Sequence, residues 1–171
     1  AIDAGHAAFT VGARAHSCRI GAMDDVRNGG RDALRGAAVR LRMATVDDVV
    51  RLVAIRATPE VRARWRGDDL EAEVRDAIAD DELHVMVVED ASGVVIGAIQ
   101  WAAEPDQEYH HASVDMYLDP AVHSRGLGTD AARTLCRHLV QAAGFHRLTI
   151  DPAADNAAAI AFLVYVVADL P

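Results

Sequence analysis

The pattern of apolar and polar positions predicts five β-strands after residue 37. Each stretch either alternates with a period of two or forms a short apolar run bounded by turn residues, as strands do. The predicted strands are Ala38–Met43, Leu83–Glu89, Val94–Ala102, Ala112–Leu118 and Arg147–Ile150. The tetrapeptide Asp-Ala-Ser-Gly between the second and third strands indicates a β-hairpin.

Apolar positions three or four residues apart predict helices between these strands. Thr45 and Asp48 form an acidic variant of the capping box before the first helix, and Pro59 ends that helix ahead of a short helical piece. Asp68 is placed to cap a second helix, and a third follows the glycine-bearing turn near Gly126. The predicted core faces are Val46, Val49, Val50 and Val53 in the first helix, Leu70, Val74 and Ile78 in the second, and Leu127, Ala131, Leu135 and Leu139 in the third. The order β-α-α-β-β-β-α-β-α, counting a last helical segment, indicates a mixed α/β fold with a mostly antiparallel first half.

Residues 1–37 differ from the rest of the chain. They are rich in Ala, Gly and Arg, and they keep neither the strand period nor the helix period for long. We therefore expect a poorly structured N-terminal extension, with a short helix near Asp25–Ala38, followed by one domain at residues 38–171.

Composition and charge narrow the possible functions. The chain has 171 residues, 51% of them hydrophobic and 25% charged, which is ordinary for one soluble globular domain. None of its 17 basic residues is a lysine, and its formal net charge is −9. The absence of lysine excludes Schiff-base chemistry, the Walker A phosphate loop and protein kinases. The acidic balance argues against nucleic acid as a partner, because that affinity comes mainly from phosphate neutralisation.

Cysteine usage and hydropathy give no sign of a disulfide framework, a metal site or a membrane span. Cys18 and Cys136 lie far apart without metal-ligand spacing, and the sequence has no H-E-x-x-H motif. No apolar run approaches the ~20 residues that span a bilayer, and the first residues lack the features of a secretory leader. We therefore expect a cytoplasmic protein without a metal site or a membrane partner.

The segment HSRGLGT, from His123 to Thr129, follows a predicted strand and opens a helix. Helix N-termini carry free backbone N–H groups and partial positive charge, and glycines let a phosphate approach that backbone closely. An arginine in the turn adds a fork of donors. These features predict a pyrophosphate cradle, formed by His123, Ser124, Arg125, Gly126, Leu127, Gly128 and Thr129. An ordinary strand-to-helix turn, with glycines for tight packing, explains the same residues.

The order of elements around this segment resembles the GNAT superfamily of N-acetyltransferases. It consists of a strand, the glycine turn, a helix, a short strand and an Asn that begins another helix. The resemblance covers about Ala38 to Ile160, with His123 where the family usually has Gln or Arg. Three further stretches, ATPEVRARWRGDD, SVDMYL and TIDPAADNAAAI, resemble the aminoglycoside 6′-N-acetyltransferases. The family implies a mixed, mostly antiparallel sheet flanked by helices, acetyl-CoA as the cosubstrate at the glycine turn, and an amine as the acceptor.

Asp115 is the candidate general base. A protonated amine attacks a thioester only after it loses a proton, so acetyl transfer needs a proton acceptor. Strand alternation puts Val114 and Met116 on one face and Asp115 with Tyr117 on the other, where partial shielding would raise the pKa of the carboxyl. The resemblance implies that Asp115 is the base and that pantetheine lies along the backbone of Met116, Tyr117 and Leu118. A solvated aspartate on the wet face of the sheet is the alternative interpretation.

The resemblance also implies a pocket for the acceptor. Its candidate residues are Trp65, Asp68, Trp101 and Asp151, and Asn156 is the candidate contact to the pantetheine arm. Ordinary structural roles also explain these residues. Trp65 can be a core or lid tryptophan, Asp151 a turn residue before a proline, and Asn156 a helix N-cap. A protein with a net charge of −9 attracts a polycationic amino sugar, so a small amine of this kind is the expected partner.

The C-terminal part departs from the family. Leu163 stands where many members have a Tyr that acts as the acid for the leaving thiolate, and Tyr165 lies about 200° further around a helix. From the resemblance we expect the last two strands of the family to be missing here, which would leave a sheet edge and apolar surface open. We therefore expect a homodimer contact or a partner segment over Ile160–Leu170. Alternative functions are transfer to another small amine or a protein N-terminus, a non-catalytic CoA-binding domain, and an interaction module that binds no cofactor.

Overall fold

The computed structural model describes residues 9–12, 33–103 and 111–152. Asn156, Leu163, Tyr165 and the segment Ile160–Leu170 lie outside these residues, and so does the last predicted helical segment.

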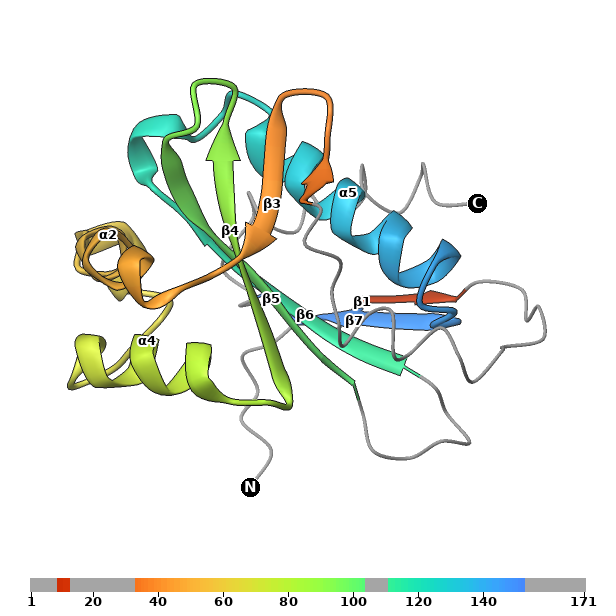
Figure 1. Ribbon diagram of the computed structural model, residues 1–171, viewed down its shortest axis with the longest axis horizontal. Helices are drawn as coiled ribbons and strands as arrows, with labels where there is room; N and C mark the ends of the chain where they lie inside the picture. The colour runs from red at the N-terminus through yellow and green to blue at the C-terminus, as the bar shows by residue number, and fades with distance from the viewer. Residues whose placement is uncertain (1–8, 13–32, 104–110, 153–171) are drawn as a thin grey trace.

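Seven strands of the described chain form one sheet in the order β1-β7-β6-β5-β4-β3-β2 (Figure 1). Their bounds are β1 Phe9–Gly12, β2 Leu34–Arg35, β3 Val39–Met43, β4 Leu83–Asp90, β5 Val95–Ala103, β6 His111–Leu118 and β7 Arg147–Ile150. The strands from β2 to β6 pair antiparallel, β6 and β7 pair parallel, and β1 is antiparallel to β7. All five predicted strands are confirmed, with their ends shifted by at most one residue.

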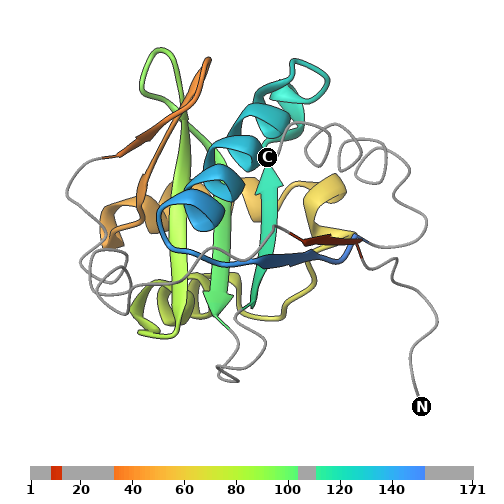
Figure 2. The same cartoon turned by 90° about the vertical axis from the view of Figure 1, so that its right-hand side faces the viewer.

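Helices cover both faces of the sheet. Their bounds are η1 Val46–Asp48, α2 Val49–Arg56, α3 Pro59–Arg62, α4 Leu70–Ala79, η2 Pro120–Val122 and α5 Leu127–Gln141. The long helix α5 crosses one face, whereas α2 and α4 lie on the other (Figures 1 and 2). This is the mixed α/β architecture with a mostly antiparallel sheet that the sequence predicts.

The sheet separates two hydrophobic cores, and the alternation of each strand decides which core a side chain enters. On the α5 side, Leu135 and Leu139 pack in one cluster with Ile99 and Leu148. The other core, between the sheet and helices α2 and α4, contains Leu52, Ile55, Val74, Val85, Val87, Ala98 and Tyr117. The predicted core face of the third helix is confirmed, since Ala131, Leu135 and Leu139 are fully buried and Leu127 packs against the same cluster.

The predicted core face of the first helix is wrong at two positions. Val46 and Val50 are 66% and 79% exposed, whereas Leu52 and Ile55 are buried. Residues 46–48 form the 3₁₀ turn η1, and the α-helix begins only at Val49. Its inward stripe therefore runs from Val49 through Leu52 and Ile55 and turns Val50 toward solvent.

The N-terminal region contributes two strands. Strand β1 pairs from Phe9 opposite Ile150 to Gly12 opposite Arg147, so the edge of β7 that we expected to be open is covered by the same chain. Strand β2 pairs with β3, and residues 37–38 form a bend. The helix expected near Asp25–Ala38 is therefore wrong over the described residues 33–38. Tertiary pairing has overridden a weak local preference there.

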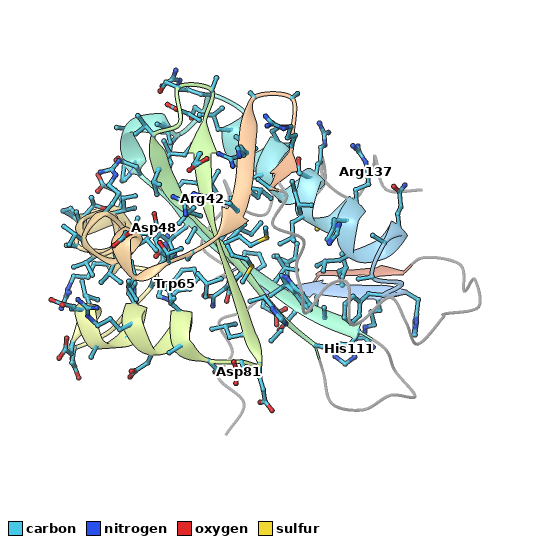
Figure 3. All side chains as sticks on the ribbon, in the orientation of Figure 1. Arg42, Asp48, Trp65, Asp81, His111 and Arg137 are labelled. Carbon is cyan, nitrogen blue, oxygen red and sulfur yellow. The ribbon has the colours of Figure 1, made fainter. Side chains whose placement is uncertain are left out.

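Asp48 is a buried carboxylate that lies next to Arg42 (Figure 3). It also accepts hydrogen bonds from Thr45. Arg42 Nη1 and Nη2 donate to its two oxygens at 2.8 Å each. The Thr45 backbone N–H and hydroxyl donate at 2.8 and 3.0 Å, which confirms the predicted capping box. The Arg42 hydrogen bonds hold the pKa of the Asp48 carboxyl below its ordinary value.

Replacing Asp48 by Asn is expected to cost about 2 kcal/mol of unfolding free energy at pH 7, because it removes the carboxylate that accepts from both Nη1 and Nη2 of Arg42 and leaves that guanidinium paired with Glu89 alone among the described residues. The folded-state pKa of Asp48 is lowered, so its contribution is complete above the unfolded value of about 4 and is lost as the pH falls through the folded value. The difference between wild type and D48N, measured by urea unfolding, is therefore expected to shrink at pH 3. The neighbouring exposed Asp47 provides the control variant D47N. An equal loss in both variants would contradict this role.

Candidate active site

The parallel strands β6 and β7 separate part-way along their length. They pair only from His111 opposite Arg147 to Ser113 opposite Thr149. On its other edge β6 pairs with β5 as far as Leu118. Beyond Ser113, the backbone groups of β6 that point toward β7 have no strand partner among the described residues, so this edge is able to hydrogen-bond an extended ligand.

The glycine turn lies directly after this edge and begins α5. Gly126 is the N-cap of the 15-residue helix, and its φ of 78° is a left-handed conformation that favours glycine. A Cβ atom built on Gly126 would meet nothing within 4 Å, so the space beside it is open. A Cβ on Gly128 would lie 3.0 Å from Met116 Cε and 3.1 Å from Leu118 Cδ1, because the first turn of the helix packs closely on β6. His123 Nε2 lies 3.2 Å from the Leu118 carbonyl oxygen and ties the turn to the same strand.

The turn fits the diphosphate of coenzyme A. The first N–H groups of an α-helix have no acceptor within the helix and carry partial positive charge, and Ser124, Arg125 and Gly126 are exposed. Asp130, also in the first turn, would repel an anion. However, its carboxylate accepts from the backbone N–H groups of residues 37, 38 and 39 at 3.0, 2.7 and 3.0 Å, which offsets that charge.

Asp115 lies on β6 directly opposite Gln100 of β5. Its alternate neighbour Tyr117 belongs to the core on the α2 and α4 side, whereas Val114 belongs to the core beneath α5. The predicted division of faces on β6 is therefore confirmed, and Asp115 shares its face with Gln100 and Tyr117. Asp115 is exposed, so the shielding that we expected for this carboxylate is not present.

A cavity of about 160 Å³ opens on the same face of the sheet, next to Asp115. Its lining comes from α2 (Leu52, Arg56), from α4 (Glu73, Val74, Ala77), from the loop before α4 (Trp65), and from the sheet (Leu83, Val85, Gln100, Tyr117). Trp65, which lies between α2 and α4 in Figure 3, meets the Tyr117 ring edge to face at 4.8 Å. Burial raises the pKa of Tyr117 to about 12, so its hydroxyl is protonated at neutral pH.

Residues 38–164 match the family model of the acetyltransferase (GNAT) domain. The chain belongs to the GNAT acetyltransferases. The resemblance to this superfamily inferred from the sequence is confirmed, and a GNAT domain is an N-acetyltransferase. A search of curated proteins finds no match.

Solved structures with the same fold have several acceptors. This GNAT domain is similar to a GNAT acetyltransferase from Bacillus anthracis, with a TM-score of 0.68, 12% identity, and 79% and 82% of the two chains covered. It is also similar to the aminoglycoside acetyltransferase AAC(6′)-Ib with coenzyme A and kanamycin, with a TM-score of 0.66, 22% identity, and coverage of 75% and 83%. A spermidine N-acetyltransferase chimera from Vibrio cholerae and hSSAT has a TM-score of 0.66, 16% identity, and coverage of 76% and 80%. At these identities the likeness shows the fold and does not select an acceptor.

The GNAT domain brings some predicted acceptor residues together and separates others. Trp65 lines the cavity, but Trp101 does not. Trp101 is buried on the α5 side, stacked on His84 at 4.0 Å and edge-on to Phe145 at 5.7 Å. The expectation that Trp101 lines the acceptor cleft is therefore wrong, because adjacent residues of a strand point to opposite faces and Gln100 takes the cavity side.

The two predicted acceptor aspartates lie outside the cavity lining. The Asp68 side chain is exposed. The Asp68 backbone N–H donates to Glu73 Oε1 of α4 at 3.0 Å. It does not cap this helix as we predicted, because the N-cap is Asp69, whose carboxylate accepts from the Ala72 N–H at 3.0 Å. Asp151 is exposed and directly follows β7, beyond the point where β7 stops pairing with β6.

Three polar cavity residues were missed by the sequence reasoning. Gln100 is the only polar side chain in its predicted strand, and its pairing with the Asp115 strand was a usable signal. Arg56 and Glu73 carried no such signal, since each looks like a surface charge on a helix. Their meeting depends on how α2 and α4 pack together.

The described residues show neither a membrane-spanning helix nor a metal-binding cluster. None of their helices combines the length and the apolar character needed to cross a bilayer. No group of three or more His, Cys, Asp or Glu side chains among them is arranged to hold a metal ion.

Proposed function

We propose that this GNAT domain transfers the acetyl group of acetyl-CoA to a primary amine of an amino-sugar-like acceptor. The observation that carries the proposal is the convergence on β6 of an exposed helix N-terminus, an edge that has separated from β7 after Ser113, and the exposed carboxylate of Asp115. A cavity able to take part of an acceptor opens beside that carboxylate.

In this proposal the cosubstrate lies along the separation between β6 and β7. The backbone amides from Gly126 to Thr129, with Arg125, bind the diphosphate. Backbone groups of Met116–Leu118 on the edge of β6 that faces away from β5 bind the pantetheine arm, and one N–H among them donates to the thioester oxygen as negative charge develops there. Asn156 is the further candidate contact to this arm.

The acceptor approaches from the α2 and α4 side. Asp115 takes a proton from the ammonium group, directly or through a water molecule, and the neutral nitrogen attacks the thioester carbonyl. A C–N bond forms, the C–S bond breaks, and the coenzyme A thiolate takes up a proton from solvent. The net charge of −9 favours a cationic acceptor, and the exposed Asp151 and Asp68 are the further candidate carboxylates for it, although neither lines the cavity.

The test is thiol release from acetyl-CoA with a panel of amines, together with calorimetry of coenzyme A binding. Turnover with kanamycin-type amino sugars supports the proposal. Faster turnover with spermidine or with a peptide amine would instead identify another acceptor class. Binding of coenzyme A without turnover on any amine would identify a non-catalytic domain, and no binding at all would remove the proposed cradle.

A further inference from the structure

We propose that Arg56 determines the acceptor specificity of this site. By neutralising Glu73 inside the cavity beside Asp115, it makes the cavity accept the uncharged, hydroxyl-bearing part of an amine substrate and reject a second ammonium group. This inference rests on the proposed function and adds to it the kind of amine that the site selects.

Arg56 is a charged residue in an apolar stripe. It is 4% exposed and follows Val49, Leu52 and Ile55 along the buried side of α2. A buried guanidinium loses much of its hydration, and an apolar residue at such a position often stabilises a protein as well or better. Arg56 Nη2 donates to the Arg66 carbonyl oxygen at 3.3 Å as well as to Glu73, so this arginine holds the loop before α4 in addition to setting the charge of the cavity.

The contacts of Arg56 occupy Glu73, the carboxylate that lines the cavity among the described residues. Arg56 Nη2 donates to Glu73 Oε2 at 2.8 Å, and the Asp68 N–H occupies Oε1 at 3.0 Å. The guanidinium also lies 5.9 Å from the centre of the Trp65 ring, where it opposes a second cation on the same aromatic surface. Glu73 is thus already paired with the Arg56 cation inside the cavity.

The groups left for a ligand are those that bind hydroxyl and ether oxygens. Tyr117 is 9% exposed, lines the cavity, and its hydroxyl makes no hydrogen bond with another described residue. The Arg56 Nε–H is buried without a hydrogen-bond partner among the described residues, and the Gln100 amide lies on the same wall. With a volume of about 160 Å³, the cavity is close to the ~150 Å³ that accommodates a benzene ring. The cavity can therefore take part of a six-membered sugar ring and its substituents, but not a whole hexose.

The experiment compares two sugars that differ in one group. One is a 6-amino-6-deoxyhexose, and the other is the 2,6-diamino analogue, in which a second ammonium replaces a ring hydroxyl. The wild-type protein is expected to prefer the monoamine by at least about 10-fold in kcat/KM, because like charges brought together are strongly unfavourable. Arg56→Gln frees Glu73 and is expected to reverse this order, with a preference for the diamine that weakens as salt is added.

Two further variants separate charge from folding. Glu73→Gln leaves the Arg56 cation unpaired and is expected to lower kcat/KM for the diamine at least about 10-fold more than for the monoamine. The double variant R56Q/E73Q restores an uncharged cavity and is expected to return the order toward that of the wild type. Because Glu73 is half exposed, E73Q is informative even if R56Q does not fold.

The outcomes distinguish this inference from the proposed function. A wild-type protein that binds coenzyme A but acetylates neither sugar overturns the proposed function, and the inference with it. A wild type that acetylates both sugars equally, or variants that change both sugars by the same factor, overturns the role of Arg56 and leaves the acetyltransferase assignment intact.

Discussion

Replacing Asp115 by Asn is expected to lower kcat about 10²- to 10³-fold with an amino-sugar acceptor, the range that general-base catalysis contributes. Asn has the same shape as Asp but cannot take the proton of the ammonium group. The affinity for acetyl-CoA is expected to stay within about 2-fold, because in the proposed site pantetheine contacts the backbone of β6 and not this side chain. Initial-rate measurements and calorimetry give the two quantities.

The matched control for D115N is D47N, which removes the same charge from an exposed position in η1 outside the cavity lining. Its kcat is expected to be that of the wild type. If the rates of D115N and the wild type were equal across the pH range, Asp115 would not be the base. A D115N protein with normal turnover but weakened coenzyme binding would assign this residue to the cosubstrate instead.

Replacing Gly126 by Glu is expected to raise the dissociation constant of acetyl-CoA at least about 30-fold. The new side chain would enter the open space beside the first turn of α5, where a carboxylate repels the diphosphate and blocks its approach to the backbone. A left-handed conformation also costs a non-glycine residue about 1–2 kcal/mol, so some loss of stability accompanies the loss of binding. Calorimetry measures the first effect and thermal unfolding the second.

Gly93 provides a close control for this prediction. Its φ is 82°, compared with 78° at Gly126, and a Cβ at either position would meet nothing within 4 Å. G93E therefore introduces the same charge and the same backbone strain at the turn between β4 and β5. Both variants are expected to lose similar stability, and only G126E is expected to lose acetyl-CoA affinity. Similar affinity losses in both would mean that strain or charge in general, rather than a cradle at Gly126, explains the result.

The sequence predicted the parts of the site that depend on neighbouring residues. The glycine turn, the following helix and the strand bearing Asp115 all occur where their local patterns place them. The division of Val114 from Asp115 and Tyr117 follows from the period of a strand. The edge of β7 was not predictable in this way, because its partner Phe9–Gly12 lies more than a hundred residues earlier in the chain.

The residues around the cavity show why the sequence did not predict long-range contacts. Trp101 and Gln100 are adjacent, and alternation states only that they point in opposite directions. The packing of α5 on one face and of α2 and α4 on the other decides that Trp101 is a core residue and Gln100 a cavity residue. Arg56 and Glu73 become an ion pair only when α2 and α4 pack side by side.

The sequence by itself determined the elements of this protein, their order and the turn suited to an anion, because each is set by periodicity, capping or glycine within a few residues. The tertiary structure alone decided which helix covers which face, that Arg56 neutralises Glu73, and that Asp130 binds the backbone before β3. These contacts join segments far apart in the chain, and their energies depend on distances and burial that no local pattern encodes.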